Sequence, residues 1–143
     1  MKKVICLIAV ALMVGSVAFA AGKMKFTAKD LPGLQGTWEG IVSFGEFDVG
    51  TSPMKLEILN DAAPLKAKLT ITNIPQGVAS QFGVMSGQNV FENDNGAITS
   101  QGTIMWSSPQ GKGFCEIAKG DNKIHFWYFS KGIKGDATLK KKK

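Results

Sequence analysis

Short runs of alternating apolar and polar residues, separated by Gly, Asn, Asp and Pro, constrain this chain more than any other feature. Alternation with a period of two places successive side chains on opposite faces of a β-strand. In Lys66–Ile74, for example, Ala67, Leu69 and Ile71 share one face, and lysines and threonines occupy the other. No segment beyond residue 21 carries an apolar stripe with the period of a long helix. The sequence therefore predicts an all-β domain.

The spacing of these runs predicts eight strands joined mostly by short loops. An even number of successive short strands favours an eight-stranded antiparallel up-and-down barrel, and a two-sheet β-sandwich is the alternative. The predicted strands are Thr37–Phe44, Met54–Asn60, Lys66–Ile74, Val84–Phe91, Ile98–Ser107, Gly113–Lys119, Lys123–Ser130 and Ile133–Lys140. The predicted organisation is a signal peptide at 1–20, an N-terminal segment at 21–35, a β-barrel domain at 36–140 and a basic tail at 141–143.

The first twenty residues have the pattern of an export signal. Lys2 and Lys3 precede an uninterrupted apolar run at Val4–Val14, and the small residues Ala18 and Ala20, three and one before the cut, indicate cleavage before Ala21. The apolar run is too short for a transmembrane helix, which needs about 20 residues. We expect a secreted or periplasmic protein without stable membrane insertion.

Charge argues against nucleic acid as a partner. The formal charge of the full chain is +6, but Lys and acidic residues are equally numerous between residues 21 and 139. The basic excess lies in Lys2, Lys3 and the terminal run Lys140–Lys143, and the chain has no Arg. A nucleic-acid surface needs clustered basic residues, and it commonly uses Arg.

Two predicted hairpins fix the register of the last three strands. A two-residue loop at 121–122 pairs Ile117 with Phe126 and Cys115 with Tyr128. A tight loop at 131–132 pairs Phe126 with Ala137. Because cross-strand partners share a face, both hairpins define one inner face, which comprises Cys115, Ile117, Ile124, Phe126, Tyr128, Ala137 and Leu139.

The turn between the fourth and fifth strands is predicted at Asn93–Gly96. Treated as a four-residue loop, this segment pairs Phe91 with Ile98. A two-residue loop at 95–96 pairs Phe91 with Ser100 instead and matches polarity less well.

Catalytic and metal-binding residues are scarce. His125 is the single histidine, and Cys115 is the single cysteine beyond the signal segment. The two-residue loop at 121–122 places them on opposite faces, whereas a three-residue loop at 120–122 places them on the same face; the first register is favoured. One His and one Cys do not make a four-ligand zinc site. We therefore expect neither an enzyme nor a metal or cofactor.

The inner face offers aromatic rings interspersed with glycines. Trp38, Trp106, Phe126 and Tyr128 are the predicted binding residues for a small apolar or amphipathic ligand inside the barrel. The alternative is that these rings fill the core, since eight strands enclose room for side chains or one ligand. The connection at 74–83 is the predicted lid over a barrel mouth.

The outer face of the last strands is unusually apolar. Phe114, Trp127 and Phe129 form a predicted interaction surface next to His125. Two coverings are open: a partner, which includes a second copy of this chain, or the N-terminal segment with its apolar residues Phe26, Leu31 and Leu34.

The tripeptide Gly36-Thr37-Trp38, which opens the first predicted strand, resembles the start of calycins, the superfamily of lipocalins, fatty-acid-binding proteins and avidins. The resemblance implies a β-barrel with an interior ligand. In lipocalins this Trp closes one barrel end under an Arg of the last strand, and here Lys140 or Lys134 would substitute for it. The Tyr and Asn that help avidins hold biotin are replaced by Glu39 and Gly40.

Overall fold

The computed structural model describes residues 24–45, 50–82, 87–108, 113–130 and 133–143. The predicted signal peptide at 1–20, the cleavage point before Ala21 and the loop at 131–132 lie outside the described residues. Within the described ranges, no helix is both long and apolar enough to cross a membrane.

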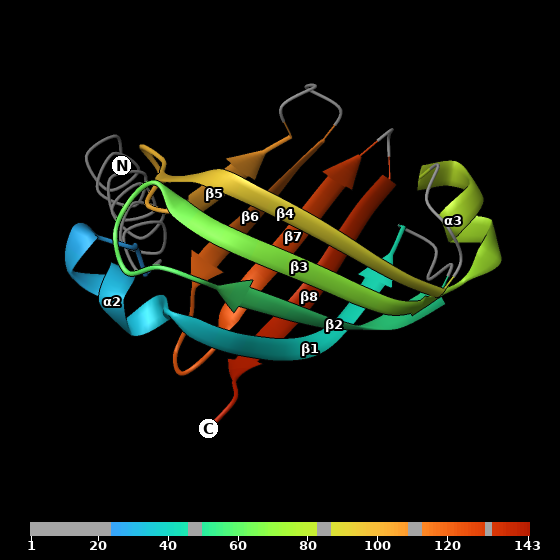
Figure 1. Ribbon diagram of the computed structural model, residues 1–143, viewed down its shortest axis with the longest axis horizontal. Coiled ribbons are helices and arrows are strands. Elements are labelled where there is room, and N and C mark those ends of the chain that lie inside the picture. Colours follow the sequence, from blue (N-terminus) through green and yellow to red (C-terminus); the bar gives the residue numbers. More distant parts are fainter. Residues whose placement is uncertain (1–23, 46–49, 83–86, 109–112, 131–132) are drawn as a thin grey trace, which may run out of the picture.

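Eight strands form a closed barrel in which each strand is antiparallel to the next, and β8 pairs back with β1 (Figure 1). The predicted up-and-down barrel is therefore confirmed, and the sandwich is set aside because the ring of strand pairs closes. β8 extends to Lys141, so the predicted tail at 141–143 is shortened to its last two residues. The elements are η1 (Ala28–Asp30), α2 (Leu31–Leu34), β1 (Gly36–Phe44), β2 (Gly50–Ile58), β3 (Leu65–Ile74), α3 (Gln76–Phe82), β4 (Gly87–Ile98), β5 (Ile104–Ser107), β6 (Gly113–Lys119), β7 (Ile124–Ser130) and β8 (Ile133–Lys141).

The last three strands have the predicted register. Cys115 pairs with Tyr128, Ile117 with Phe126, and Phe126 with Ala137. The β6–β7 turn includes Asn122, whose φ of 54° is a left-handed conformation that Asn tolerates better than most residues. The side chains predicted to face inward lie in the barrel interior, and Tyr128 is the partly buried member of the set.

The predicted turn at Asn93–Gly96 is wrong in both of its forms. β4 continues through this segment, and the chain reverses at 99–103, so Ile98 pairs with Ile104. In the real turn the Gly102 N–H donates to the Thr99 carbonyl at 3.0 Å, and Gly102 has a φ of 79°. The predicted fifth strand at 98–107 is correspondingly shortened to β5.

Asn95 and Gly96, the turn-forming residues of this segment, instead contact the neighbouring strand β5. The Asn95 amide donates to the Ser107 carbonyl at 2.8 Å and accepts the Ser107 N–H at 3.3 Å, so it takes the place of a backbone partner. Gly96 provides space for the indole of Trp106, since a Cβ at this position would lie 2.3 Å from the indole nitrogen. Residue type predicts both of them in a turn, but their contacts are cross-strand.

The N-terminal segment closes one end of the barrel (Figure 1). Phe26, Leu31 and Leu34 are buried in the core, and the Trp38 indole N–H donates to the Leu34 carbonyl at 2.9 Å. Of the two coverings open for the outer aromatic face, the one by these apolar residues is therefore wrong, because they fill the barrel end.

The last strand supplies a cation at the same end. Lys141 Nζ lies 5.8 Å from the Trp38 ring centroid and donates to the Gly33 carbonyl at 2.7 Å. The expected substitutes Lys140 and Lys134 are wrong, because the alternation of β8 directs both to the outside, where they are exposed.

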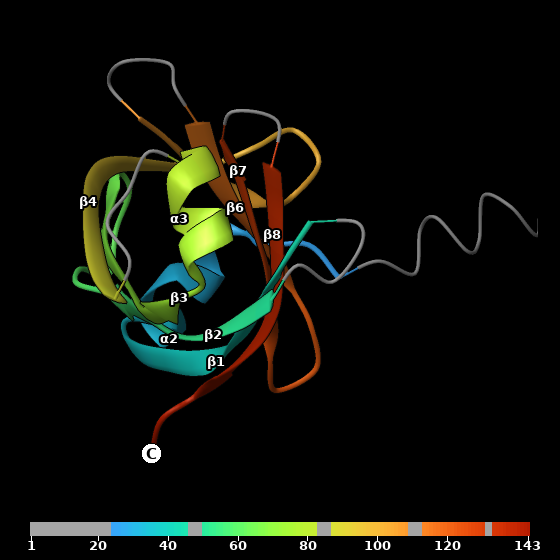
Figure 2. The same ribbon diagram turned by 90° about the vertical axis from the view of Figure 1, so that its right-hand side faces the viewer.

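The opposite end of the barrel is crossed by α3 (Figure 2). Val78 and Ala79 are buried, and the Ala79 N–H donates to the Pro75 carbonyl at 2.9 Å. The connection at 74–83, predicted as a lid, thus contributes a helix whose apolar residues belong to the core.

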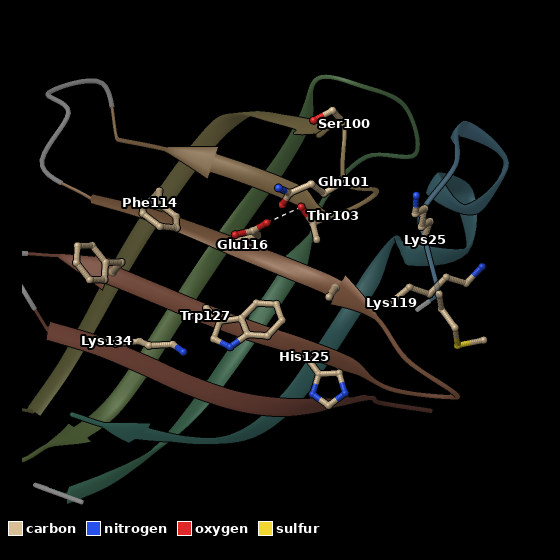
Figure 3. Close-up of a pocket in the computed structure, with 13 residues that line it drawn as sticks. Lys25, Ser100, Gln101, Thr103, Phe114, Glu116, Lys119, His125, Trp127 and Lys134 are labelled. Atoms are coloured by element: carbon tan, nitrogen blue, oxygen red, sulfur yellow. Dashed lines mark hydrogen bonds between the residues drawn. The ribbon is translucent and has the colours of Figure 1, made fainter. Parts of the chain in front are cut away.

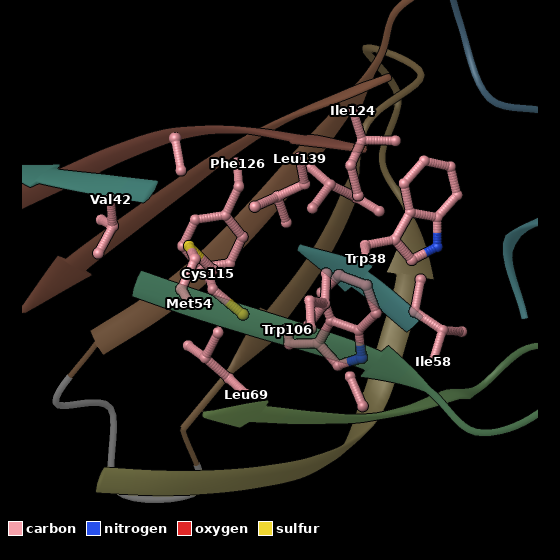
Figure 4. Packing of buried hydrophobic residues seen from close by; sticks show 14 of the residues in the cluster. Trp38, Val42, Met54, Ile58, Leu69, Trp106, Cys115, Ile124, Phe126 and Leu139 are labelled. Carbon is pink, nitrogen blue, oxygen red and sulfur yellow. The ribbon is translucent and has the colours of Figure 1, made fainter. Parts of the chain in front are cut away.

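The core lies within the barrel and joins both ends (Figure 4). Trp106 and Phe126 have no exposed surface, and the Trp106 indole N–H donates to the Leu65 carbonyl at 2.9 Å. Among the described residues, no buried side-chain nitrogen or oxygen lacks a hydrogen-bond partner.

Candidate functional site

An open groove of about 1010 Å³ lies on the outer face of the barrel, over β6, β7 and β8 and beside the turn at 99–103 (Figure 3). We call it the outer aromatic groove. It comprises Met24, Lys25, Ser100, Gln101, Thr103, Phe114, Glu116, Ala118, Lys119, His125, Trp127, Phe129 and Lys134.

Strand alternation places the aromatic residues there. Cys115 and Phe126 face the interior, so their neighbours Phe114, His125 and Trp127 face outward. The predicted interaction surface of Phe114, Trp127 and Phe129 therefore lies in one groove. Phe129 retains 42% of its surface exposed.

The rings form two neighbouring pairs. The centroids of Phe114 and Phe129 lie 5.7 Å apart at an interplanar angle of 25°. Those of His125 and Trp127 lie 6.3 Å apart at 24°. The second distance is close to the spacing of alternate residues along a strand, about 6.7 Å, so His125 and Trp127 lie side by side. Figure 3 shows the broad faces of these two rings turned outward.

Hydrogen bonds and an ion pair fix Trp127 and the polar side chains beside it. The Trp127 indole N–H donates to Asp136 Oδ2 at 3.1 Å. Beside it, Glu116 is the residue opposite Trp127 on β6, and it accepts a hydrogen bond from the Thr103 hydroxyl. Lys134 Nζ lies 3.9 Å from Asp136.

The 99–103 turn and the N-terminal segment form one wall. The Phe26 N–H donates to the Gly102 carbonyl at 2.8 Å, and the Lys25 side chain covers Gly102 closely. At the end of β6, Lys119 Nζ lies 2.6 Å from Asp30. The hydrogen bonds from Lys119 and from the Thr27 N–H hold the pKa of the Asp30 carboxyl below its ordinary value.

Sequence reasoning found the rings of this site but missed its wall. Met24, Lys25, Ser100, Gln101 and Thr103 were not predicted to join the groove. The usable signal was Ser-Gln-Gly at 100–102, a turn-forming tripeptide, which the prediction placed inside a strand.

The four residues predicted to bind an interior ligand do not all have the same environment. Trp38, Trp106 and Phe126 are buried, at 7%, 0% and 0% exposure. Tyr128 is partly buried and packs against Phe91, with ring centroids 5.9 Å apart.

The inner glycines lie against neighbouring side chains. A Cβ at Gly40 would lie 2.7 Å from Leu139, and one at Gly135 would lie 3.1 Å from Val42. Space next to these glycines is therefore filled by apolar side chains.

Cys115 and His125 lie on opposite faces, as the favoured register predicts. Cys115 is buried in the core, and this burial raises the pKa of its thiol to about 12. His125 lines the outer aromatic groove. Among the residues that the structure describes, no three His, Cys, Asp or Glu residues gather as a metal site would require.

The chain was compared with protein-family models, with curated proteins and with solved structures, and none of the three comparisons gives a match. The class of protein is therefore defined by the fold alone, an eight-stranded antiparallel β-barrel.

Proposed function

We propose that this protein is a non-enzymatic binding protein that docks its partner through the outer aromatic groove, over a filled barrel core. The observation that carries the proposal is that the half-buried rings of Phe114 and Trp127 and the exposed ring of Phe129 line one groove on a single sheet face. Contiguous exposed apolar surface rimmed by polar groups commonly marks an interaction site.

The packing of the interior supports this choice over an interior ligand. The buried indoles of Trp38 and Trp106 each donate to a backbone carbonyl, so their orientation is explained by the fold. The glycines that could have left space beside them face Leu139, Val42 and Trp106.

An interior ligand site is the second candidate. It is favoured by the partly buried Phe91 and Tyr128, which lie where β4 and β5 diverge, since described β4–β5 pairs occur only at Ala97 and Ile98. A calycin relationship would also fit this candidate, and the position of Lys141 over Trp38 supports it.

The two candidates are separated by the fluorescence of the dye anilinonaphthalene sulfonate. We expect Trp127→Ser and Phe129→Ser to lower the dye emission, because they remove apolar surface of the groove. Val90→Ser is the matched control, since Val90 is 46% exposed on β4 and does not line the groove. If Phe91→Ser lowers the emission and the groove variants leave it unchanged, the interior candidate replaces the proposal.

A further inference from the structure

The shape and chemistry of the outer aromatic groove define its occupant more closely. This step rests on the proposed function. We propose that the groove binds a neutral, extended oligosaccharide, whose sugar rings stack on the two aromatic pairs and whose hydroxyls bond to the polar rim.

The orientation of the rings is the first argument. His125 and Trp127 lie side by side and present their faces outward (Figure 3). The Trp127 indole is held by its hydrogen bond to Asp136. Aromatic faces carry partial negative charge and attract the weakly positive C–H groups on the flat face of a pyranose ring. A flat exposed platform suits a sugar ring, whereas a single apolar side chain of a protein partner is best held in an enclosed pocket.

The polar rim is the second argument. Glu116 lies opposite Trp127 and two residues along β6 from Phe114. Its carboxylate has about four acceptor positions, of which Thr103 uses one. Gln101, Ser100 and Lys134 lie around the same groove. These groups together provide donors and acceptors, which hydroxyl-bearing sugars require.

Charge is the third argument, and it favours a neutral ligand. Lys119 is paired with Asp30 at 2.6 Å, and Lys134 lies 3.9 Å from Asp136. Glu116 offsets the remaining lining cation, so the groove has no excess charge of either sign. A polyanion would therefore gain no electrostatic attraction there.

The length of the platform is the fourth argument. From His125 through Trp127 to Phe129, alternate residues of β7 span about 13 Å. An extended chain of sugars matches a row of side chains on a strand better than a helical chain does. We therefore expect β-1,4-linked chains to bind better than α-1,4-linked ones.

Binding is measured by titration calorimetry and by acrylamide quenching of tryptophan emission, with cellohexaose and chitohexaose as ligands and maltohexaose as the comparison. Of the three tryptophans, Trp38 and Trp106 are buried, so a ligand that shields emission from acrylamide reports on Trp127. We expect cellohexaose or chitohexaose to reduce quenching and maltohexaose to bind at least about tenfold more weakly, which corresponds to one lost stacking contact.

Variants locate the binding. Trp127→Ala and Phe129→Ala each weaken binding by about tenfold or more, Trp127→Phe restores part of it, and Val90→Ala on β4 leaves it unchanged. Phe129 is well exposed, so its variant keeps the test valid if Trp127→Ala fails to fold.

Other outcomes overturn the inference in distinguishable ways. If none of the three oligosaccharides binds, but the protein self-associates in sedimentation and Trp127→Ser abolishes this, the oligosaccharide is wrong and the docking function stands. If neither oligosaccharide binding nor self-association occurs, and the dye emission does not depend on Trp127 or Phe129, both proposals fail.

Discussion

Substitution of Gly96 by Ala tests whether this residue belongs to the sheet or to a turn. An added Cβ would lie 2.3 Å from the Trp106 indole nitrogen, 2.5 Å from the adjacent ring carbon and 3.0 Å from Leu65. The φ of Gly96 is not in the left-handed region, so Ala meets no backbone penalty there. Any loss of stability therefore comes from these contacts, of which those with the indole are the closest.

The expected loss has two parts. Overpacking a filled core costs about 1–3 kcal/mol. Movement of the indole also weakens the 2.9 Å hydrogen bond from its N–H to the Leu65 carbonyl. A buried donor or acceptor left without a partner costs about 1–3 kcal/mol. Because relaxation relieves part of both, we expect the free energy of unfolding to fall by about 2–4 kcal/mol, a large share of the roughly 5–15 kcal/mol typical of a domain.

Equilibrium denaturation in urea, followed by circular dichroism, measures this change. Gly77→Ala in α3 is the matched control, because nothing lies within 4 Å of its added Cβ; it should be neutral or stabilise by up to about 1 kcal/mol. In a Trp106→Phe background the smaller ring without an N–H should remove at least half of the Gly96→Ala loss. A loss below about 1 kcal/mol, or the same loss in both backgrounds, would refute the reasoning.

Three further predictions concern titration, reactivity and the β4–β5 junction. Because the pKa of Asp30 is lowered in the folded state, its contribution to stability is complete above its unfolded pKa and is lost as pH falls through its folded pKa. Asp30→Asn should therefore cost about 1 kcal/mol or less at pH 7 and reduce the loss of stability in acid. Acid denaturation curves measure this, and unchanged curves would contradict it. Burial raises the pKa of the Cys115 thiol to about 12. In a Cys6→Ser variant, this thiol should therefore react with a disulfide reagent at pH 8 only as the protein unfolds. Rapid labelling of the native protein would contradict its burial. Asn95→Ala should cost about 1 kcal/mol and speed hydrogen exchange of the Ser107 amide, and unchanged exchange would show that the side chain does not support the junction.

The hairpins of the last three strands were predictable because two signals agreed. Each loop length fixes a register, and the registers of both hairpins placed Phe126 on the same apolar face as Cys115 and Ala137. An error of one residue in either loop would have moved side chains to the wrong face. Agreement between independent constraints therefore specified the inner and outer faces, and with them the rings of the groove.

The β4–β5 region was not predictable in the same way. Gly and Asn mark turns in most sequences, but Gly96 is required by the size of Trp106, which is distant in sequence. Asn95 likewise finds its partner in Ser107. Both contacts become visible only when the strands are placed side by side, and the wall of the candidate site depends on that placement.

β7 and β8 show why the aromatic rings of the groove need a functional explanation. Both strands contribute buried residues such as Phe126 and Leu139 to the core, and this inward half of the alternation is sufficient to close the barrel. The outward half is free to be polar, and β8 uses it for residues such as Lys134 and Asp136. β7 instead directs His125, Trp127 and Phe129 outward beside Phe114 of β6. Closure of the barrel does not require this arrangement, and outward apolar rings favour aggregation. A bound partner that covers the rings would explain why the rings point outward and would shield them from aggregation.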